Sequence, residues 1–377
     1  MKKKCDLYYI RNFISLIHCA CITKQMQNKN YKILYINYKW INKEVFLYFK
    51  NFFYLYFDEI NTFNFKSLDY ANSNFIKEKK IGFINRIILR SKNLIKFKKK
   101  LTFIEDRFIV ENIFSGGDDF HLLFKNKKKI YYIEHGIGNY RDGLVYKTKK
   151  LLSYINCFLK FFNFLGFKIY YLKKYDFYIS VLSNKIKLNL NLNNYEVNYL
   201  STRKKYFVSV LKNMSKYLKK KIVDDRYKNK KKIFLNISGF KYINHNISLN
   251  LVKKVIKKIN KDEIVIFKDH PRFQQKNIKL KILFQEQLKK NKIKFFEINN
   301  NLLKKLPMEL LIYFLNAKKL ISSWSATPLF CSILFNNKFK TILFADYSLK
   351  FPEDFEAKRN EIFYNTVKDN FKNITYL

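Results

Sequence analysis

Short apolar runs alternate with amphipathic stretches along most of this chain, and that alternation is typical of a parallel sheet covered by helices on both faces. In the first half the apolar runs predict strands at 5–10, 32–36, 100–104 and 129–133. Apolar positions at helical spacing predict the helices between them, at 13–25, 44–53 and 74–100. The first half therefore predicts one doubly wound α/β domain.

The second half repeats the pattern. Its predicted strands are 233–237, 263–267, 293–297, 319–321 and 340–344, and its predicted helices are 248–260, 276–290, 307–316 and 326–334. A chain of 377 residues exceeds what one core normally fills. We expect an acceptor-side domain at 1–200, a ligand-binding domain at 201–355, and a C-terminal helix at 356–377 that packs back across the cleft.

Polar residues follow three predicted strands of the second half. The carboxyl ends of parallel strands form the edge where open α/β sheets bind ligands. Cationic and hydroxyl groups gathered there suit a phosphate. These candidate ligand-binding residues are Ser238, Gly239, Lys268, His270, Pro271, Arg272, Ser322 and Ser323. For the two serines, capping of the helix that follows is the other interpretation.

Glu309 opens the helix predicted at 307–316. A carboxylate in this position can accept hydrogen bonds from the hydroxyls of a ribose, but it also stabilises the positive end of its own helix. Both interpretations stay open.

A second candidate site follows the predicted strand 129–133, where the chain reads Glu134-His135-Gly136. A carboxylate and an imidazole at a strand end, followed by glycine, can take a proton from a hydroxyl group, since histidine titrates near neutral pH. A structural hydrogen bond in a glycine-rich turn is the alternative for His135.

Several classes of protein are excluded. The sequence has neither a GxGxxG nor a Walker A motif, which argues against dinucleotide oxidoreductases and P-loop NTPases. Its five cysteines form no CxxC pair and indicate reduced thiols. Asp118 and Asp119 are interpreted as a helix cap, so we expect no metal site and no cofactor.

The net charge of +46 is extreme. Lysines are spread through the whole chain beside many Asn, Ile, Phe and Tyr residues, a bias that a low-GC genome produces without selection for binding. The charge also suits an anionic surface, such as a membrane leaflet. No run reaches the ~18 apolar residues of a membrane span. We expect a cytoplasmic protein, peripheral on the inner face of the membrane, that binds no specific nucleic acid.

Four short elements, taken in order, resemble the bacterial sialyltransferases and capsule polysialyltransferases. They are Glu134-His135-Gly136, Lys268-x-His270-Pro271, Pro307-x-Glu309 and Ser322-Ser323. The resemblance implies two facing Rossmann-like domains of the GT-B type. It also implies a CMP-activated sugar donor held by the C-terminal domain, and inverting transfer to a glycan or glycolipid acceptor without a metal.

Carried over residue by residue, the resemblance gives each position a role. His270 would stabilise or protonate the departing CMP with Lys268 beside it, Ser322 and Ser323 would bind the phosphate, and Glu309 would bind the ribose. The family commonly has two acidic residues before the glycine of the first loop, but here the second is His135. The general base is therefore either Glu134 or His135.

The sequence favours a sialyltransferase-like glycosyltransferase that works beside polysaccharide export machinery. One alternative is another surface-polysaccharide glycosyltransferase that uses CMP-Kdo or a UDP-sugar. The other is a basic protein, without enzyme activity, that binds nucleic acid or another polyanion, although no nucleic-acid-binding module is recognisable.

Overall fold

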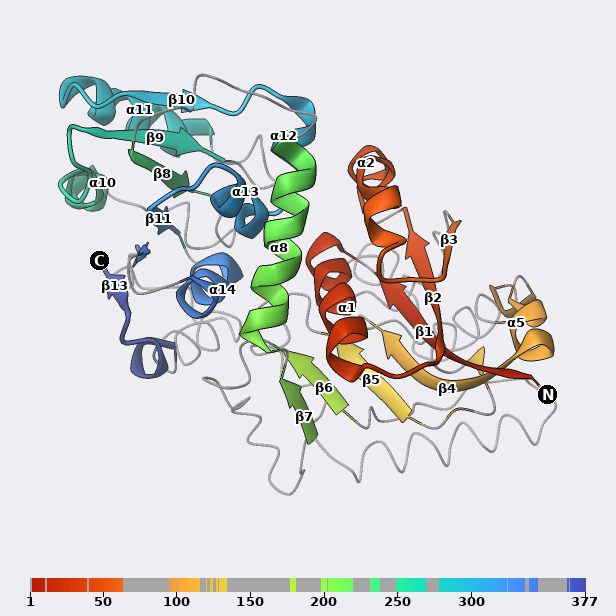
Figure 1. The fold of residues 1–377 in the computed structure, drawn as a ribbon. Coiled ribbons are helices and arrows are strands. Elements are labelled where there is room, and N and C mark those ends of the chain that lie inside the picture. The colour runs from red at the N-terminus through yellow and green to blue at the C-terminus, as the bar shows by residue number, and fades with distance from the viewer. Residues whose placement is uncertain are drawn as a thin grey trace, which may run out of the picture. The chain divides into compact units, whose positions relative to one another are not determined.

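The computed structural model of the chain contains two parallel sheets with helices packed on them (Figure 1). It describes residues 2–10, 12–38, 41–63, 95, 97–99, 101–115, 120, 123–124, 127, 129–133, 177–180, 198–201, 203–219, 231–237, 249–268, 278–323, 325–335, 339–344, 365 and 367–377. The α/β class with two Rossmann-like sheets is confirmed.

The first sheet has seven parallel strands in the order β3-β2-β1-β4-β5-β6-β7. Its strands are β1 (Lys3–Ile10), β2 (Tyr31–Asn37), β3 (Glu59–Phe63), β4 (Phe108–Ser115), β5 (Lys129–Ile133), β6 (Phe177–Ser180) and β7 (Asn198–Ser201). The order doubles back beside β1, as in doubly wound folds, and every pairing is parallel.

Helices α1 (Phe13–Met26) and α2 (Lys43–Phe53) follow β1 and β2. Each starts at an asparagine whose side chain accepts a hydrogen bond from a backbone N–H of the first turn. The Asn12 Oδ1 accepts from Ser15 N at 2.8 Å, and the Asn42 Oδ1 accepts from Val45 N at 3.2 Å. Such caps satisfy N–H groups that have no partner within the helix.

The strand predicted at 100–104 is wrong, because α5 (Thr102–Arg107) occupies this part of the chain. The buried residues Leu101, Ile104 and Phe108 recur at intervals of three and four, which is the helical period, while Phe103 is 40% exposed. The strand itself follows as β4. The prediction took this short apolar segment as a strand, but the exposure of Phe103 between buried neighbours fits a helix.

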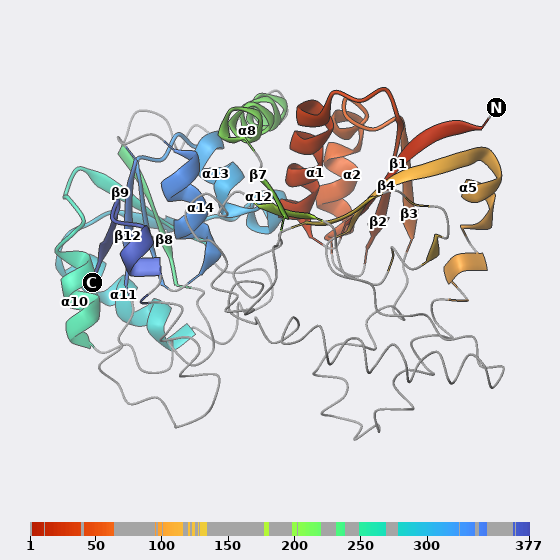
Figure 2. The same ribbon diagram turned by 90° about the horizontal axis from the view of Figure 1, so that it is seen from below.

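The second sheet has six parallel strands in the order β10-β9-β8-β11-β12-β13. Its strands are β8 (Lys231–Asn236), β9 (Glu263–Phe267), β10 (Phe295–Glu297), β11 (Lys319–Ser322), β12 (Lys340–Leu343) and β13 (Ile374–Tyr376). Its helices are α8 (Lys204–Lys219), α10 (Leu249–Ile256), α11 (Ile278–Lys290), α12 (Asn301–Lys305), α13 (Met308–Phe314) and α14 (Ala326–Leu334). Figure 2 shows α10 and α11 on one side of this sheet and α8, α13 and α14 on the other.

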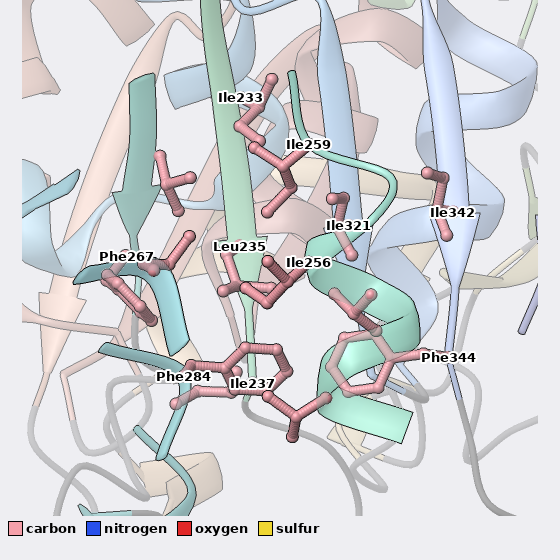
Figure 3. Close-up of a cluster of buried hydrophobic side chains, with 14 of the residues drawn as sticks. Ile233, Leu235, Ile237, Ile256, Ile259, Phe267, Phe284, Ile321, Ile342 and Phe344 are labelled. Carbon is pink, nitrogen blue, oxygen red and sulfur yellow. The ribbon is translucent and has the colours of Figure 1, made fainter. Parts of the chain in front are cut away.

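Alternate residues of the central strands supply the core beneath α10 and α11. Ile233, Leu235 and Ile237 point from β8 and its end toward Ile256 and Phe284 of the two helices (Figure 3). Successive side chains of a strand point to opposite faces, so the residues between them face α8, α13 and α14. Both faces of the sheet are thus covered by helices, which explains the nearly continuous apolar runs of its strands.

The chain divides into two compact units, and Arg203–Leu377 belongs to the second. Helix α8 opens this part of the second unit and packs against α13 and α14. None of the helices in the described ranges has the length and apolar character needed to cross a membrane.

Candidate functional site

The carboxyl ends of three neighbouring strands of the second sheet meet at one edge. Strand β8 lies between β9 and β11, and Asn236 at its end pairs in register with Ser322. Lys268 follows the last residue of β9, and its backbone N–H donates to the Leu235 carbonyl of β8 at 3.4 Å. The sequence placed Lys268, Ser322 and Ser323 at this edge, where α/β folds bind ligands.

Ser322 is fully buried, and its hydroxyl forms hydrogen bonds with neighbouring groups of the protein. Its Oγ accepts a hydrogen bond from the Asn236 Nδ2 at 3.0 Å and donates to the Ser323 carbonyl at 2.7 Å. The Ser325 hydroxyl lies 3.3 Å away. Ser322 therefore joins the ends of β8 and β11 and supports the turn that leads into α14.

Ser323 differs from its neighbour. Its backbone N–H donates to the Asn236 carbonyl at 2.8 Å, but its hydroxyl is buried without a hydrogen-bond partner among the described residues. Helix α14 begins three residues later, and its N-cap residue Ser325 makes no capping hydrogen bond with its side chain. An unpaired hydroxyl and the N–H groups of a helix start together offer donors to an anion.

Glu309 lies in the first turn of α13 and is 5% exposed. Burial raises the pKa of its carboxyl group, and three interactions act against this rise: a hydrogen bond from its own backbone N–H, one from the Thr327 hydroxyl, and the charge of Lys268. Because Thr327 lies in the first turn of α14, the carboxylate connects the starts of two helices. Glu309 thus serves at least as a helix-end carboxylate, the structural role that its position allows.

Lys268 is also buried, at 5% exposure, and its Nζ donates to the Lys304 carbonyl at the end of α12. Its ammonium group favours the ionised form of Glu309. Lys268, Glu309 and Thr327 therefore form one polar group, and the turn at Ser322 and Ser323 leads into the helix that carries Thr327. Its chemistry suits a ligand that carries negative charge and hydroxyl groups.

The remaining candidates lie outside the described residues, and their roles stay predictions. They are Glu134, His135, Ser238, Gly239, His270, Pro271 and Arg272. Asp118 and Asp119 lie outside as well. Within the part of the chain that is described, no group of three or more His, Cys, Asp and Glu residues is placed to hold a metal ion.

Two residues of this region were not among the sequence candidates. Asn236 holds Ser322 in place, and Thr327 hydrogen-bonds to Glu309. Asn236 was detectable as a polar residue that ends an apolar strand. Thr327 gave no such signal, because its contact depends on how α13 and α14 pack together.

Comparison with known proteins gives a fold and no family: no family model and no curated protein matches the sequence. Among solved structures, a UDP-N-acetylglucosamine 2-epimerase matches over 99% of this chain and 90% of its own, with a TM-score of 0.50 and 10% identity. A UDP-N-acetylglucosamine 2-epimerase from Rickettsia bellii covers 98% and 88%, with a TM-score of 0.48 and 17% identity. A glycosyltransferase from Rickettsia africae ESF-5 covers 98% and 95%, with a TM-score of 0.45 and 16% identity.

The GT-B architecture, with two Rossmann-like domains, is therefore confirmed. The resemblance to sialyltransferases and polysialyltransferases is wrong: no family model or curated protein matches the sequence, and a solved structure that shares the fold over nearly the whole chain is a UDP-N-acetylglucosamine 2-epimerase. The four short elements misled because Rossmann-like domains in general collect basic and hydroxyl residues at strand ends. They reflected the fold and carried no information on the donor, so nothing supports CMP as its nucleotide.

Proposed function

We propose that this chain is an enzyme that acts on a nucleotide-activated sugar and transfers the sugar of a UDP-sugar to an acceptor. The GT-B architecture supports this proposal, because its two Rossmann-like domains can hold the donor and the acceptor. One solved structure that shares the fold over nearly the whole chain is of a UDP-N-acetylglucosamine 2-epimerase, an enzyme of a UDP-sugar. This supports uridine over cytidine as the base of the nucleotide.

The single observation that carries the proposal is the Ser323 hydroxyl. It is buried without a described partner beside the start of α14, and an unpaired buried hydroxyl costs about 1–3 kcal/mol. A diphosphate at this place would accept a hydrogen bond from the hydroxyl and from the N–H groups of the helix start. The diphosphate of UDP is thus the ligand group that Ser323 would satisfy.

Glu309 and Lys268 would complete the nucleotide site. An ionised carboxylate has roughly four positions for accepting hydrogen bonds, and Glu309 uses some of them for its own N–H and for Thr327. The remaining capacity suits the ribose hydroxyls of uridine. Lys268, His270 and Arg272 would supply positive charge near the diphosphate, with Ser238, Gly239 and Pro271 in the adjoining loops.

In the transfer, the acceptor oxygen forms a bond to the anomeric carbon of the sugar while the bond from that carbon to the β-phosphate oxygen breaks. The acceptor proton passes to the general base, which is Glu134 or His135. The electron pair of the broken bond stays on the departing UDP, and the cationic groups around the diphosphate offset its charge.

Epimerisation of UDP-N-acetylglucosamine is the second candidate. It is favoured by the name of the structure with which the fold matches at a TM-score of 0.50. Proton exchange and inversion at C2 of the sugar would distinguish it from transfer.

Calorimetric titration with UDP, UMP and CMP tests the proposal. We expect preference for UDP, weakened about tenfold or more in Ser323→Ala, since a hydrogen bond to a charged group contributes about 1.5–3 kcal/mol. Ser332→Ala is the matched control, because Ser332 lies within α14, the helix that Ser323 precedes, and its hydroxyl donates to the Leu329 carbonyl. NMR of the sugar product then separates transfer from epimerisation. Preference for CMP, or equal losses in both variants, would contradict the proposed site.

A further inference from the structure

The outer surface of α10 and α11 combines exposed aliphatic side chains with a high density of lysine. Leu249, Ile278 and Ile282 are 42–50% exposed. Among the described residues of the second unit, they are the large hydrophobic side chains with the highest exposure. All three lie on these two helices. We call the outer surface of the two helices the α10–α11 face.

The charge of this face is strongly positive. Its exposed lysines lie on the two helices and on the turn after α10; they are Lys253, Lys254, Lys257, Lys258, Lys279, Lys289 and Lys290. Glu286 is the exposed acidic residue of the two helices. None of these lysines forms an ion pair with a residue that the structure describes, whereas the partly buried Lys281 pairs with Glu297 at 2.7 Å.

The two helices present this face rigidly. They pack against each other, and their inner sides join the core over β8 and β9 (Figure 3). Leu249 and Ile278 are the first residues of their helices, and the lysines continue toward the helix ends. The inner sides cannot rotate outward without opening the core, so aliphatic groups and ammonium groups stay together on one outer surface.

We propose that the α10–α11 face docks on a lipid bilayer that carries anionic head groups. The lysines attract the charged surface, and the aliphatic side chains enter the boundary between head groups and acyl chains. A nucleic acid or another polyanion would neutralise the same lysines but would leave the aliphatic side chains in water. The presence of both kinds of group on one face therefore favours the membrane.

Flotation with lipid vesicles tests this proposal on the full chain. Vesicles of phosphatidylglycerol and phosphatidylcholine in equal parts are compared with vesicles of phosphatidylcholine alone. We expect binding to the anionic vesicles only. The double variants Lys253→Glu with Lys254→Glu, and Ile278→Ser with Ile282→Ser, should each lower the partition coefficient about tenfold or more.

Matched variants control for net charge and for exposed apolar area. Lys212→Glu with Lys216→Glu makes the same charge change on exposed positions of α8. Leu47→Ser with Leu55→Ser removes exposed aliphatic groups from α2 and from the turn that follows it. Both should bind vesicles as the unmodified chain does. Circular dichroism checks folding, and Lys289→Glu with Lys290→Glu replaces the first pair if that pair unfolds.

Equal losses in the α8 control would show that net charge alone drives binding, which would overturn the proposal. Unchanged binding in Ile278→Ser with Ile282→Ser would overturn it as well, and would point to a polyanion site if heparin competes with the vesicles. Absence of binding by the unmodified chain would have the same consequence.

Discussion

Each of the two sheets buries a carboxylate, but the two domains neutralise it by different means. Asp6 on β1 is fully buried and accepts hydrogen bonds from three asparagine amides: Asn28 at 2.6 Å, Asn30 at 2.9 Å and Asn112 at 2.7 Å. Glu263 on β9 faces the ammonium of Lys319 at 2.6 Å, and the same carboxylate oxygen accepts from Asn260 N at 2.8 Å. The first domain uses neutral dipoles and the second uses an opposite charge.

This very basic chain therefore does not use lysine at every buried carboxylate. At Asp6 the pairing between β1 and β4 shifts by one residue, and Asn112 of β4 is thereby placed beside it. Local backbone geometry there supplies several weak donors. At Glu263 one strong donor joins the first residues of β9 and β11, the two strands that flank β8. The donor is Lys319, which also donates to the Lys258 carbonyl at 2.9 Å.

Lys319→Met should have the largest effect. It leaves the Glu263 carboxylate buried without its counter-charge, so the second domain should lose about 3–5 kcal/mol of unfolding free energy. Hydrogen exchange of peptides from β8 and β9 measures this loss in the intact chain.

The double variant Lys319→Met with Glu263→Leu separates the loss of the counter-charge from the loss of packing. It removes both charges and retains apolar volume, so most of the stability should return. If the double variant is as unstable as the single one, the loss comes from packing of the lysine stem and the ion pair is unimportant.

Asp6→Asn should have a smaller effect, about 2–3 kcal/mol in the first domain, because one of the two acceptor oxygens becomes a donor that faces other donors. Asp58→Asn is the matched control. Asp58 is exposed and accepts one hydrogen bond, from Lys32 N at 2.7 Å, so its loss should stay below about 1 kcal/mol. Hydrogen exchange of β1 and β2 peptides compares the two. If the two variants lose similar amounts of unfolding free energy, the buried hydrogen bonds of Asp6 contribute no more than an exposed hydrogen bond does.

The sequence predicted much of the second domain, because its strands are short, continuous apolar runs separated by lysine-rich helices. It missed α8, because no helix was predicted between the domain boundary at 200 and the strand at 233–237. The buried residues Phe207, Val210, Leu211, Met214 and Leu218 recur there at helical spacing. Numerous lysines between them concealed that period. The strand β13 was missed for another reason, since a three-residue strand depends on pairing with β12 more than on its own sequence.

For the candidate site, the sequence located the strand ends but did not show which polar groups there are hydrogen-bonded within the protein. It treated Ser322 and Ser323 as equivalent. In the structure the first hydroxyl is used by Asn236 and the second has no described partner. This distinction depends on the register between β8 and β11, which no local pattern reports. The choice of nucleotide likewise depends on contacts across elements, so the short motifs carry no information on it.

Two buried titratable groups, one in each domain, change stability with pH in opposite directions. Burial lowers the pKa of His18 in α1 from 6.5 to about 3, so the folded first domain keeps this imidazole neutral. As pH falls below 6.5 the unfolded chain binds a proton that the folded chain does not, and stability is lost. Burial raises the pKa of Glu309, so its contribution is full below the unfolded value near 4.5 and is lost as pH rises through the folded pKa.

Hydrogen exchange at pH 7.5 and pH 5 should separate the two. When the unfolded state binds one proton more than the folded state, the unfolding free energy falls by about 1.4 kcal/mol per pH unit. His18 should therefore lower the unfolding free energy of the first domain by about 2 kcal/mol at pH 5. The variant His18→Gln should remove this difference and leave the pH response of the second domain unchanged. In Glu309→Gln the second domain should lose its opposite pH response while the first keeps its own. If His18→Gln retains the full loss of stability at pH 5, other groups cause the acid sensitivity of the first domain. The difference between the two domains would then be limited to how they stabilise the buried carboxylates Asp6 and Glu263.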